Sequence, residues 1–495
     1  MAENNTSYGN IFKTTFLFGF VQVFRAVMSI IKNKVAAILI GAEGMGILGI
    51  FSSTAQMIQT GAGLGINQSA VRDISEANGA GNYNRFSKII SVTNKVILYT
   101  GLLGCIITLC LSYWLSEWTF GDTAHIVGYC ILSAAIALNI MNESKQAILK
   151  GMRQLKALAY ASMLGSAAGL ITSVPLYYFF GKEGIVPELL ISAIVAILVS
   201  EYYVKKIDYT KQPLSLSETF KEAKPMVKMG VALMLMTFLQ TIASFIINAY
   251  IRSVGGLEDV GYFSAGTAIL NSYFGIIITA LMTDYYPRIA AVNQDNSKLQ
   301  EELNKQSLVS VVLCCPMFIL FMTLLPTFIK ILYSESFLPT VDFVKWSIYY
   351  TLITVCSNQV DMILVAKFNS KVFLALSIFF RIFLVAACIG LYSSLGLEGL
   401  GFAYMLFGIA HLFVMSFTVY KLYKIRFSGL FIKVGLCVLL FAVASSLVQQ
   451  LMTGSPYYLA SVLLLITSCI FSYYISVKYL ELDFIGFINK RMKRK

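Results

Sequence analysis

The sequence predicts an all-α integral membrane protein with about fourteen transmembrane helices. Apolar residues make up 57% of its 495 positions and charged residues 13%, whereas soluble proteins average about 45–50% and about 25%. Apolar runs of about 20 residues, the length that a helix needs to cross a bilayer, recur from end to end. An outer-membrane barrel would instead show short segments of alternating polarity. The polar residues 1–13 lack a small-residue cleavage site, so we expect the run that follows to be a span and not a signal peptide.

Taken in order, each long apolar run is expected to form one helix across the bilayer. The first twelve helices are expected to form the core of the protein, and the last two an additional C-terminal pair. The predicted helices cover residues 14–40, 44–65, 91–113, 122–142, 158–180, 184–204, 228–251, 260–283, 308–331, 340–366, 372–393, 397–420, 430–450 and 457–477.

A short internal repeat relates two of these helices. Gly49-Ile-Phe-Ser52 in the second helix matches Gly261-Tyr-Phe-Ser264 in the eighth. The match predicts two six-helix lobes related by a pseudo-repeat, a common plan among transporters, with a cavity between them. Chance similarity of apolar segments is the alternative. The predicted parts are an N-terminal lobe over 1–206, a cytoplasmic linker over 207–227, a C-terminal lobe over 228–425, and a helix pair with a basic cytoplasmic tail over 426–495.

Lysine and arginine predict the orientation in the membrane. Most of the 38 basic residues fall in loops that share one side if the N-terminus is cytoplasmic, with dense clusters at 145–156, 205–228, 421–433 and 490–495. This bias predicts a multi-pass protein with both termini in the cytoplasm. Contact of these loops with anionic lipid headgroups accounts for the net charge of +13, so no nucleic-acid partner is expected.

Arg25 is the most informative residue, because it lies near the middle of the first predicted span. Gln22, Arg25, Ser29 and Lys32 are spaced so that they share one face of a helix. A cation at the bilayer centre costs about 2.5–3.5 kcal/mol, so such residues usually face a polar cavity. This face predicts an anionic cargo. The alternatives are pairing with a structural carboxylate and, for Lys32, extension of the side chain towards the interface.

Polar side chains continue on other helices. The second helix carries Gln56 and Gln59, the seventh carries Gln240, Ser244 and Asn248 before Arg252 in an outer loop, and the eighth carries Asn271. Interhelical hydrogen bonds, each contributing about 0.6 kcal/mol, would explain single members of this set. Their recurrence in corresponding helices of the two halves favours a shared polar cleft.

Three more charged residues are predicted at membrane depth. Arg381 is as deep in its helix as Arg25, and Lys345 lies one or two turns below the outer surface. Asp361 is the clearest opposing charge. It is interpreted either as a proton or cation site that drives a transport cycle, or as a structural charge partner of Arg25 or Arg381.

Cysteine and histidine give no sign of a metal site. The nine cysteines all fall in apolar runs without metal-ligand spacing, and they are interpreted as small buried hydrophobic residues. His125 and His411 lie on separate predicted helices, where packing is the simpler role and a proton relay the alternative. No metal and no cofactor are expected.

Several motifs in a fixed order resemble those of Wzx-type polysaccharide flippases. The similarity covers about residues 10–425 and is closest to O-antigen and lipid III translocases, within the superfamily of multidrug, oligosaccharidyl-lipid and polysaccharide exporters. The motifs are Gly41-Ala-Glu-Gly-Met-Gly-Ile-Leu-Gly49, Gly61-Ala-Gly-Leu-Gly65, Lys150-Gly-Met-Arg153, Glu258-Asp-Val-Gly-Tyr-Phe-Ser264, Tyr286-Pro-Arg288, Ile331-Leu-Tyr-Ser-Glu-Ser-Phe337, Val365-Ala-Lys367 and Gly396-Leu-Glu-Gly399.

The resemblance implies a flippase that moves an oligosaccharide on undecaprenyl diphosphate from the cytoplasmic to the periplasmic leaflet of the bacterial inner membrane by alternating access. It implies no enzymatic activity. The implied partners are the lipid-linked substrate, membrane lipids and other polysaccharide-assembly proteins. Together with the polar faces, the residues expected to bind substrate are Arg25, Lys32, Gln22, Ser29, Gln56, Gln59, Gln240, Ser244, Asn248, Arg252, Asn271, Lys345 and Arg381, with Asp361 as a coupling or charge-pair residue.

Four other classes of protein compete with this interpretation, one of them a scaffold protein without transport activity, in which deep cations would serve only for pairing. A multidrug or small-molecule antiporter of the same superfamily is the nearest alternative, although exporters of cationic drugs favour acidic cavity residues. A membrane polysaccharide polymerase would need catalytic groups in a large periplasmic loop, and the predicted outer loops are short. An ATP-driven pump is disfavoured, because the sequence contains no G-x-x-x-x-G-K-[ST] motif.

Overall fold

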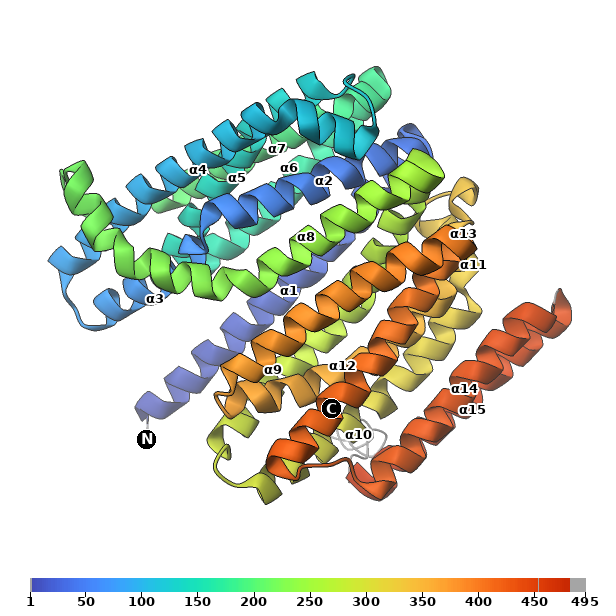
Figure 1. Ribbon diagram of the computed structural model, residues 1–495. Coiled ribbons are helices and arrows are strands. Elements are labelled where there is room, and N and C mark those ends of the chain that lie inside the picture. The colour runs from blue at the N-terminus through green and yellow to red at the C-terminus, as the bar shows by residue number, and fades with distance from the viewer. Residues whose placement is uncertain (1, 453, 481–495) are drawn as a thin grey trace. The chain divides into compact units, whose positions relative to one another are not determined.

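The computed structural model describes residues 2–452 and 454–480, and within these ranges the chain is helical with no strand (Figure 1). Helices occupy all of the fourteen predicted ranges. By length and composition, nine helical stretches in the described part could cross a membrane. Two of these, Leu155–Val204 and Ser370–Tyr423, each contain two of the predicted helices, and Leu216–Ile269 contains the seventh and the first part of the eighth. The first two predicted helices are not among the nine. The predicted all-helical class is therefore confirmed.

Contacts divide the chain into two compact units. Unit 1 comprises Met1–Ala265 with Leu332–Ser336, and unit 2 comprises Gly266–Ile331 with Phe337–Lys495. The helices of unit 1 are α1 (Ala2–Leu39), α2 (Gly41–Gly63), α3 (Ile66–Gly79), α4 (Tyr83–Phe120), α5 (Ile126–Gly151), α6 (Leu155–Phe180), the short η1 (Gly181–Gly184), α7 (Ile185–Val204) and most of α8 (Leu216–Ile269). These segments differ from the predicted lobes, whose boundaries stay a prediction.

Unit 2 starts near the end of α8. Its further elements are the π-helix η2 (Leu270–Phe274), α9 (Gly275–Ala291), α10 (Asn296–Thr323), α11 (Leu325–Leu332) up to Ile331, α12 (Thr340–Ala366), α13 (Ser370–Tyr423), α14 (Gly429–Leu451) and α15 (Ser455–Leu480). The short η3 (Glu335–Phe337) lies mostly in unit 1. The C-terminal pair packs on α10 through a common apolar cluster that includes Val311, Cys315, Val434, Val438 and Ile475.

Two glycines separate helices that otherwise run on. Gly256 interrupts α8 with φ 84°, and Gly396 interrupts α13 with φ 60°. Glycine adopts positive φ at little cost because it lacks a Cβ atom. Each break falls between two predicted helices, so it separates the seventh from the eighth and the eleventh from the twelfth.

Two local features differ from the predicted elements. The unpredicted helix α3 is amphipathic and buries Ile66, Ala70 and Ile74. Helix α8 begins at Leu216 and not at residue 228, because Ser215 and Glu218 cap it reciprocally. The Glu218 amide donates to the Ser215 hydroxyl over 3.2 Å, and the Ser215 amide donates to the Glu218 carboxylate over 2.8 Å. This Ser-x-x-Glu capping pattern is visible in the sequence.

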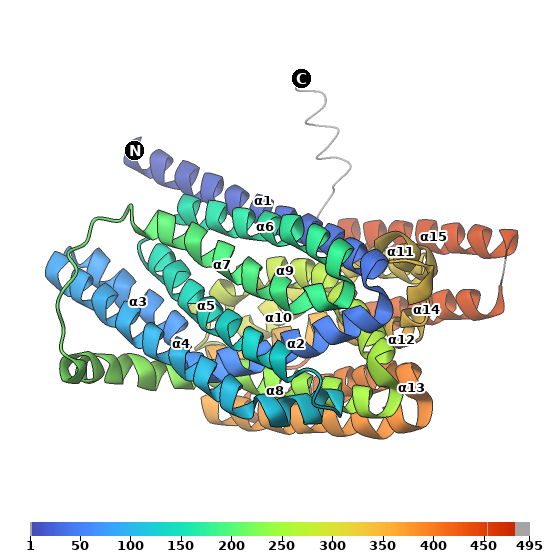
Figure 2. The ribbon, with the colours of Figure 1, turned by 90° about the horizontal axis from the view of Figure 1, so that it is seen from above.

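Small residues allow α2 and α8 to approach each other closely inside unit 1. A Cβ atom on Gly46 would lie 1.9 Å from the Leu257 carbonyl oxygen, and one on Gly261 would lie 2.0 Å from the Ala42 carbonyl oxygen. The two segments that carry the internal repeat are therefore in direct backbone contact. On the other side of the unit, α1 lies along α6 (Figure 2).

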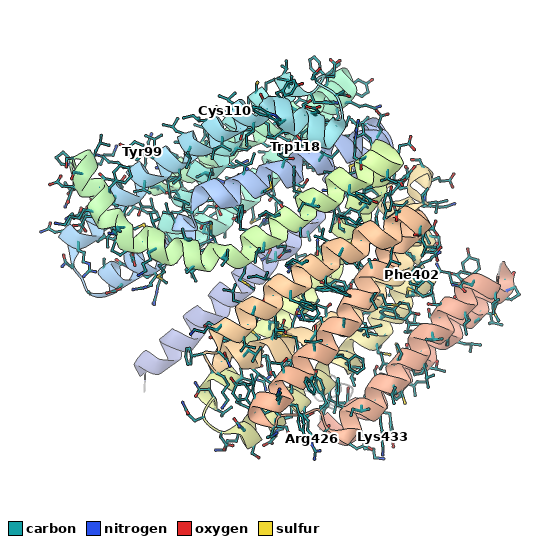
Figure 3. The ribbon with its side chains drawn as sticks, in the orientation of Figure 1. Tyr99, Cys110, Trp118, Phe402, Arg426 and Lys433 are labelled. Atoms are coloured by element: carbon teal, nitrogen blue, oxygen red, sulfur yellow. The ribbon has the colours of Figure 1, made fainter. Side chains whose placement is uncertain are left out.

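The outward faces of both units carry exposed apolar side chains. On α4 the exposed residues include Tyr99 and Trp118, which Figure 3 labels along this helix together with Cys110. Such faces are typical of helices in contact with lipid. Cys110 and Cys469 are exposed, so the expectation that all nine cysteines are buried is wrong for these two.

Candidate functional site

Helix α1 exposes two chemically different faces. Gln22, Arg25 and Ser29 are exposed on one of them. Val23 and Val27 are exposed on the other side of the helix, in line with Phe20 and Ile31. In a bilayer the apolar face suits contact with lipid, whereas an exposed arginine needs water, a ligand or a counter-charge. The polar face of α1 is therefore a candidate lining of an aqueous pathway.

Arg25 carries an uncompensated charge. Among the residues that the structure describes, its guanidinium group has neither a hydrogen-bond acceptor nor an ion-pair partner. An exposed and unpaired guanidinium group keeps all of its donors available for an anion. Of the predicted site residues in unit 1, Arg25 has the geometry that most directly fits an anionic ligand.

Lys32, on the same face, is paired. Its Nζ atom donates to Oε1 of Glu188 over 2.8 Å, and the two side chains are 26% and 0% exposed. Glu188 lies in the first turn of α7, where the positive end of the helix dipole stabilises a carboxylate. Ser192 and Tyr177 also donate to Glu188, over 2.6 Å and 3.2 Å. In this structure the cationic face is therefore partly neutralised.

Glu188 is the site residue that the sequence analysis missed. Its signal was present, because it is an acidic residue inside a predicted span, and such residues are candidate functional groups by default. Periodicity along a single helix could not show that a carboxylate on α7 meets a lysine on α1.

Polar side chains of α2 and α8 are accessible in the same unit. Gln56 is exposed and Gln59 partly so, and α2 exposes no large apolar side chain among the described residues. On α8, Gln240 is exposed, Ser244 is half-buried and Asn248 is buried. The Asn248 Oδ1 atom has no hydrogen-bond partner in the described part of the chain.

Arg252 lies in α8 and not in an outer loop as predicted, and its side chain reaches the C-terminal end of α4. Its guanidinium group packs against Gly121, because a Cβ atom on that glycine would lie 2.1 Å from the Arg252 Nη1 atom. Gly121 caps α4 with positive φ. The contact gives Arg252 a structural role in addition to any contact with a ligand.

In unit 2, Asp361 on α12 and His411 on α13 form one cluster with Arg381. The Asp361 Oδ2 atom lies 3.7 Å from His411 Nε2, and Arg381 is close enough to interact electrostatically with both residues. The Asp361 Oδ1 atom is buried and has no hydrogen-bond partner among the described residues. The structure thus brings together three ionisable residues that the sequence identified separately.

Lys345 is held between two carboxylates at the start of α12. Its Nζ atom lies 2.9 Å from Asp342 and 3.1 Å from Glu398, and the Trp346 indole also donates to Glu398 over 2.8 Å. These contacts offset its charge. Asn271, in the π-helix η2, is exposed. In the described ranges, no group of three or more His, Cys, Asp or Glu side chains could hold a metal ion.

Comparison with known proteins identifies the family to which the sequence is similar. The profile of the family described as polysaccharide biosynthesis protein matches residues 87–342. A Shigella flexneri protein named "Putative O-antigen transporter" is 23% identical over 280 residues, which are 55% of this chain and 65% of that protein. The match thus spans slightly less than two thirds of the length of that relative.

Two solved structures share the fold. The inward closed conformation of the lipid II flippase MurJ gives a TM-score of 0.70 at 15% identity, over 95% of this chain and 99% of that one. The inward-facing conformation of a multidrug resistance MATE family transporter of the MOP superfamily gives 0.67 at 19% identity, over 82% and 99%. At these identities the likeness establishes the fold alone. The protein is a multi-pass membrane protein, as the sequence predicted.

Proposed function

The chain belongs to the polysaccharide biosynthesis protein family, and on this premise we propose that it is a flippase for a lipid-linked oligosaccharide. The substrate is an O-antigen or related surface-polysaccharide repeat unit on undecaprenyl diphosphate. The protein moves it from the cytoplasmic to the periplasmic leaflet by alternating access, without covalent chemistry. The resemblance of its motifs to Wzx-type flippases supports the same proposal.

One observation carries the proposal above all: the unpaired, exposed guanidinium group of Arg25 on the polar face of α1, which the sequence predicts to be the first span. A diphosphate headgroup matches such a group, because arginine forms paired, charge-assisted hydrogen bonds with phosphate oxygens. A neutral cargo would provide no charge interaction that offsets the free-energy cost of this cation in the membrane.

The sugar chain needs a hydrogen-bonding path through the hydrocarbon layer. Amides and hydroxyls on α1, α2 and α8 supply such groups: Gln22, Ser29, Gln56 and Gln240 are exposed, and Gln59 and Ser244 are partly exposed. We propose that these side chains replace water around the oligosaccharide. The undecaprenyl tail needs no protein cavity, because it is as apolar as the surrounding lipid.

The other cationic residues contribute unequally to the proposed site. We propose that Arg381 in unit 2 also binds the headgroup, with Asp361 as its coupling or charge-pair residue. Lys32 contributes to anion binding only when it is released from Glu188. Lys345 and Arg252 keep mainly structural roles, because two carboxylates surround the first and the second packs on Gly121.

We propose that the protein lies in the bacterial inner membrane with both termini in the cytoplasm. Basic residues in the connections after α7 and α13 are exposed, among them Lys205, Lys206 and Arg426, and Figure 3 shows Arg426 and Lys433 near the α13–α14 connection. Exposed basic connections favour the cytoplasmic side and contact with anionic lipids.

Transport in proteoliposomes tests the proposal. Purified protein is reconstituted with a labelled undecaprenyl-diphosphate oligosaccharide, and its movement between leaflets is followed for the natural protein and for Arg25→Ala. Transport that depends on Arg25 supports a flippase with a cationic headgroup site. Correctly folded protein without any transport of this lipid contradicts it.

A second candidate function is export of cationic small molecules. Buried carboxylates in both units, Glu188 and Asp361, are the kind of group that binds a cationic drug. Each already has a basic neighbour, which makes this function the weaker proposal. Efflux of a cationic dye from the same proteoliposomes, in the absence of lipid transport, would favour it.

A further inference from the structure

We propose that Glu188 is a proton-binding site coupled to the headgroup site. When an anionic headgroup engages Lys32, the Glu188 carboxylate takes up a proton, so that the two ligands bind together. The inference rests on the proposed function, since it requires that an anion reaches Lys32.

Accessibility gives the two partners different roles. The Lys32 side chain is 26% exposed, whereas that of Glu188 is 0% exposed. A ligand on the polar face of α1 can therefore reach the ammonium group and cannot reach the carboxylate. Glu188 senses the ligand only through Lys32.

Lys32 is the positive charge that balances Glu188 in this structure. Helix α7 packs against α2, α5, α6 and η1. The acid Glu43 of α2 pairs with Lys182 of η1, and α6 contributes the phenol of Tyr177. Among the described contacts, α5 brings no charged group to Glu188. No second cation is therefore in place to compensate the carboxylate when Lys32 turns to another anion.

A headgroup at Lys32 destabilises the charged form of Glu188 in two ways. The ammonium group shares its donors with phosphate oxygens, and the negative phosphates repel the nearby carboxylate. A buried carboxylate that loses its counter-charge becomes neutral by binding a proton. Protonation thus removes the repulsion between the phosphates and the buried carboxylate.

The neutral form of Glu188 also has partners. A protonated carboxyl group needs an acceptor for its new donor. The Ser192 hydroxyl lies 2.6 Å from Oε1 and the Tyr177 hydroxyl 3.2 Å from Oε2. A hydroxyl can rotate and accept instead of donating. Ser192 also lies 3.4 Å from the Thr172 hydroxyl, whose oxygen can accept the hydrogen bond that Ser192 then donates.

Because linkage is reciprocal, acid pH must strengthen headgroup binding by the same free energy by which the headgroup strengthens proton binding. Calorimetry of the full-length protein with undecaprenyl diphosphate as the probe measures both effects. Titrations in buffers of different ionisation enthalpy give the number of protons taken up on binding. We expect uptake of close to one proton per bound probe in the natural protein near neutral pH.

The Glu188→Gln variant tests whether proton uptake on headgroup binding depends on Glu188. Glutamine resembles the protonated acid, so we expect this variant to bind the probe with almost no proton uptake and with little dependence on pH. As a matched control, Glu43→Gln removes an acid that is 44% exposed in its pair with Lys182. This control should retain the proton uptake of the natural protein.

The outcomes distinguish the inference from the proposed function. Binding without proton uptake in the natural protein, or uptake that persists in Glu188→Gln, overturns the inference and leaves the flippase proposal intact. Absence of binding counts against the diphosphate headgroup itself and overturns both. If Glu188→Gln does not fold, infrared difference spectra of the natural protein decide the question, because the carbonyl band of a protonated carboxyl group must appear when the probe is added.

Discussion

The Lys32 ammonium group lies 2.8 Å from the carboxylate of Glu188, whose side chain is completely buried. The lysine that marks a cationic helix face in the sequence is thus half of an ion pair between α1 and α7. The polar face of α1 therefore contains one compensated cation, Lys32, and one uncompensated cation, Arg25.

The ion pair predicts an unequal response to mutation. Lys32→Met should lower stability by about 3 kcal/mol at neutral pH, because it leaves a buried carboxylate unpaired. The double variant Lys32→Met/Glu188→Gln should recover most of the stability. Thermal unfolding of the purified protein in detergent measures this, and equal losses in the single and double variants would contradict it.

Arg25 should be essential for transport. Arg25→Ala is expected to reduce translocation of the lipid-linked oligosaccharide by about tenfold or more, since a hydrogen bond to a charged group contributes about 1.5–3 kcal/mol. Lys34→Ala is the control on α1, because Lys34 donates to the Tyr333 backbone oxygen, and its effect should be mild. Equal effects of the two variants in proteoliposomes would refute a binding role confined to the polar face.

The glycine contact between α2 and α8 should tolerate no side chain. Gly46→Ala places a methyl group on the Leu257 carbonyl oxygen, and overpacking of this kind typically costs about 1–3 kcal/mol. Gly63→Ala is the matched control on the same helix, because a Cβ atom there meets nothing within 4 Å. Thermal midpoints compare the two variants. A harmless Gly46→Ala would show that the helices separate at low cost.

The cluster of Asp361, His411 and Arg381 allows a test of whether Asp361 carries a coupling proton or only balances the charge of Arg381. If Asp361 carries a coupling proton, Asp361→Asn should abolish the response of transport to an imposed pH gradient while the protein remains folded. If Asp361 only balances Arg381, the pH response should persist in this variant. Lys345→Met, which breaks an ion pair outside this cluster, should keep the response and serves as the control.

His125 should make stability sensitive to acid. Its ring stacks on Phe120 at a centroid distance of 3.8 Å, and burial, assisted by Arg252, lowers its pKa below the ordinary 6.5 although Asp122 opposes this. The unfolded chain then binds the proton more tightly. The contribution of neutral His125 to the free energy of unfolding is therefore fully present above about pH 6.5, and it is lost as the pH falls through the lowered pKa. His125→Phe should flatten that decline in thermal unfolding, and an unchanged slope would assign it to other groups.

Helix positions could be predicted because their signal is local. Runs of about 20 apolar residues identify spans, and the breaks at Gly256 and Gly396 fall where two such runs meet. The ends of the helices were harder to predict from the sequence. The start of α8 depends on the reciprocal cap of Ser215 and Glu218, which extends the helix into a polar segment without apolar periodicity.

The sequence by itself determined the all-helical membrane class, the cationic face of α1 and the family, because composition, periodicity and motif order are properties of the linear chain. Only the tertiary structure decided which charges are neutralised. It paired Lys32 with Glu188 and Lys345 with Asp342 and Glu398, and it left Arg25 unpaired. The physical reason is that an ion pair depends on a distance of a few ångströms between separate helices, and no pattern along one helix specifies that distance.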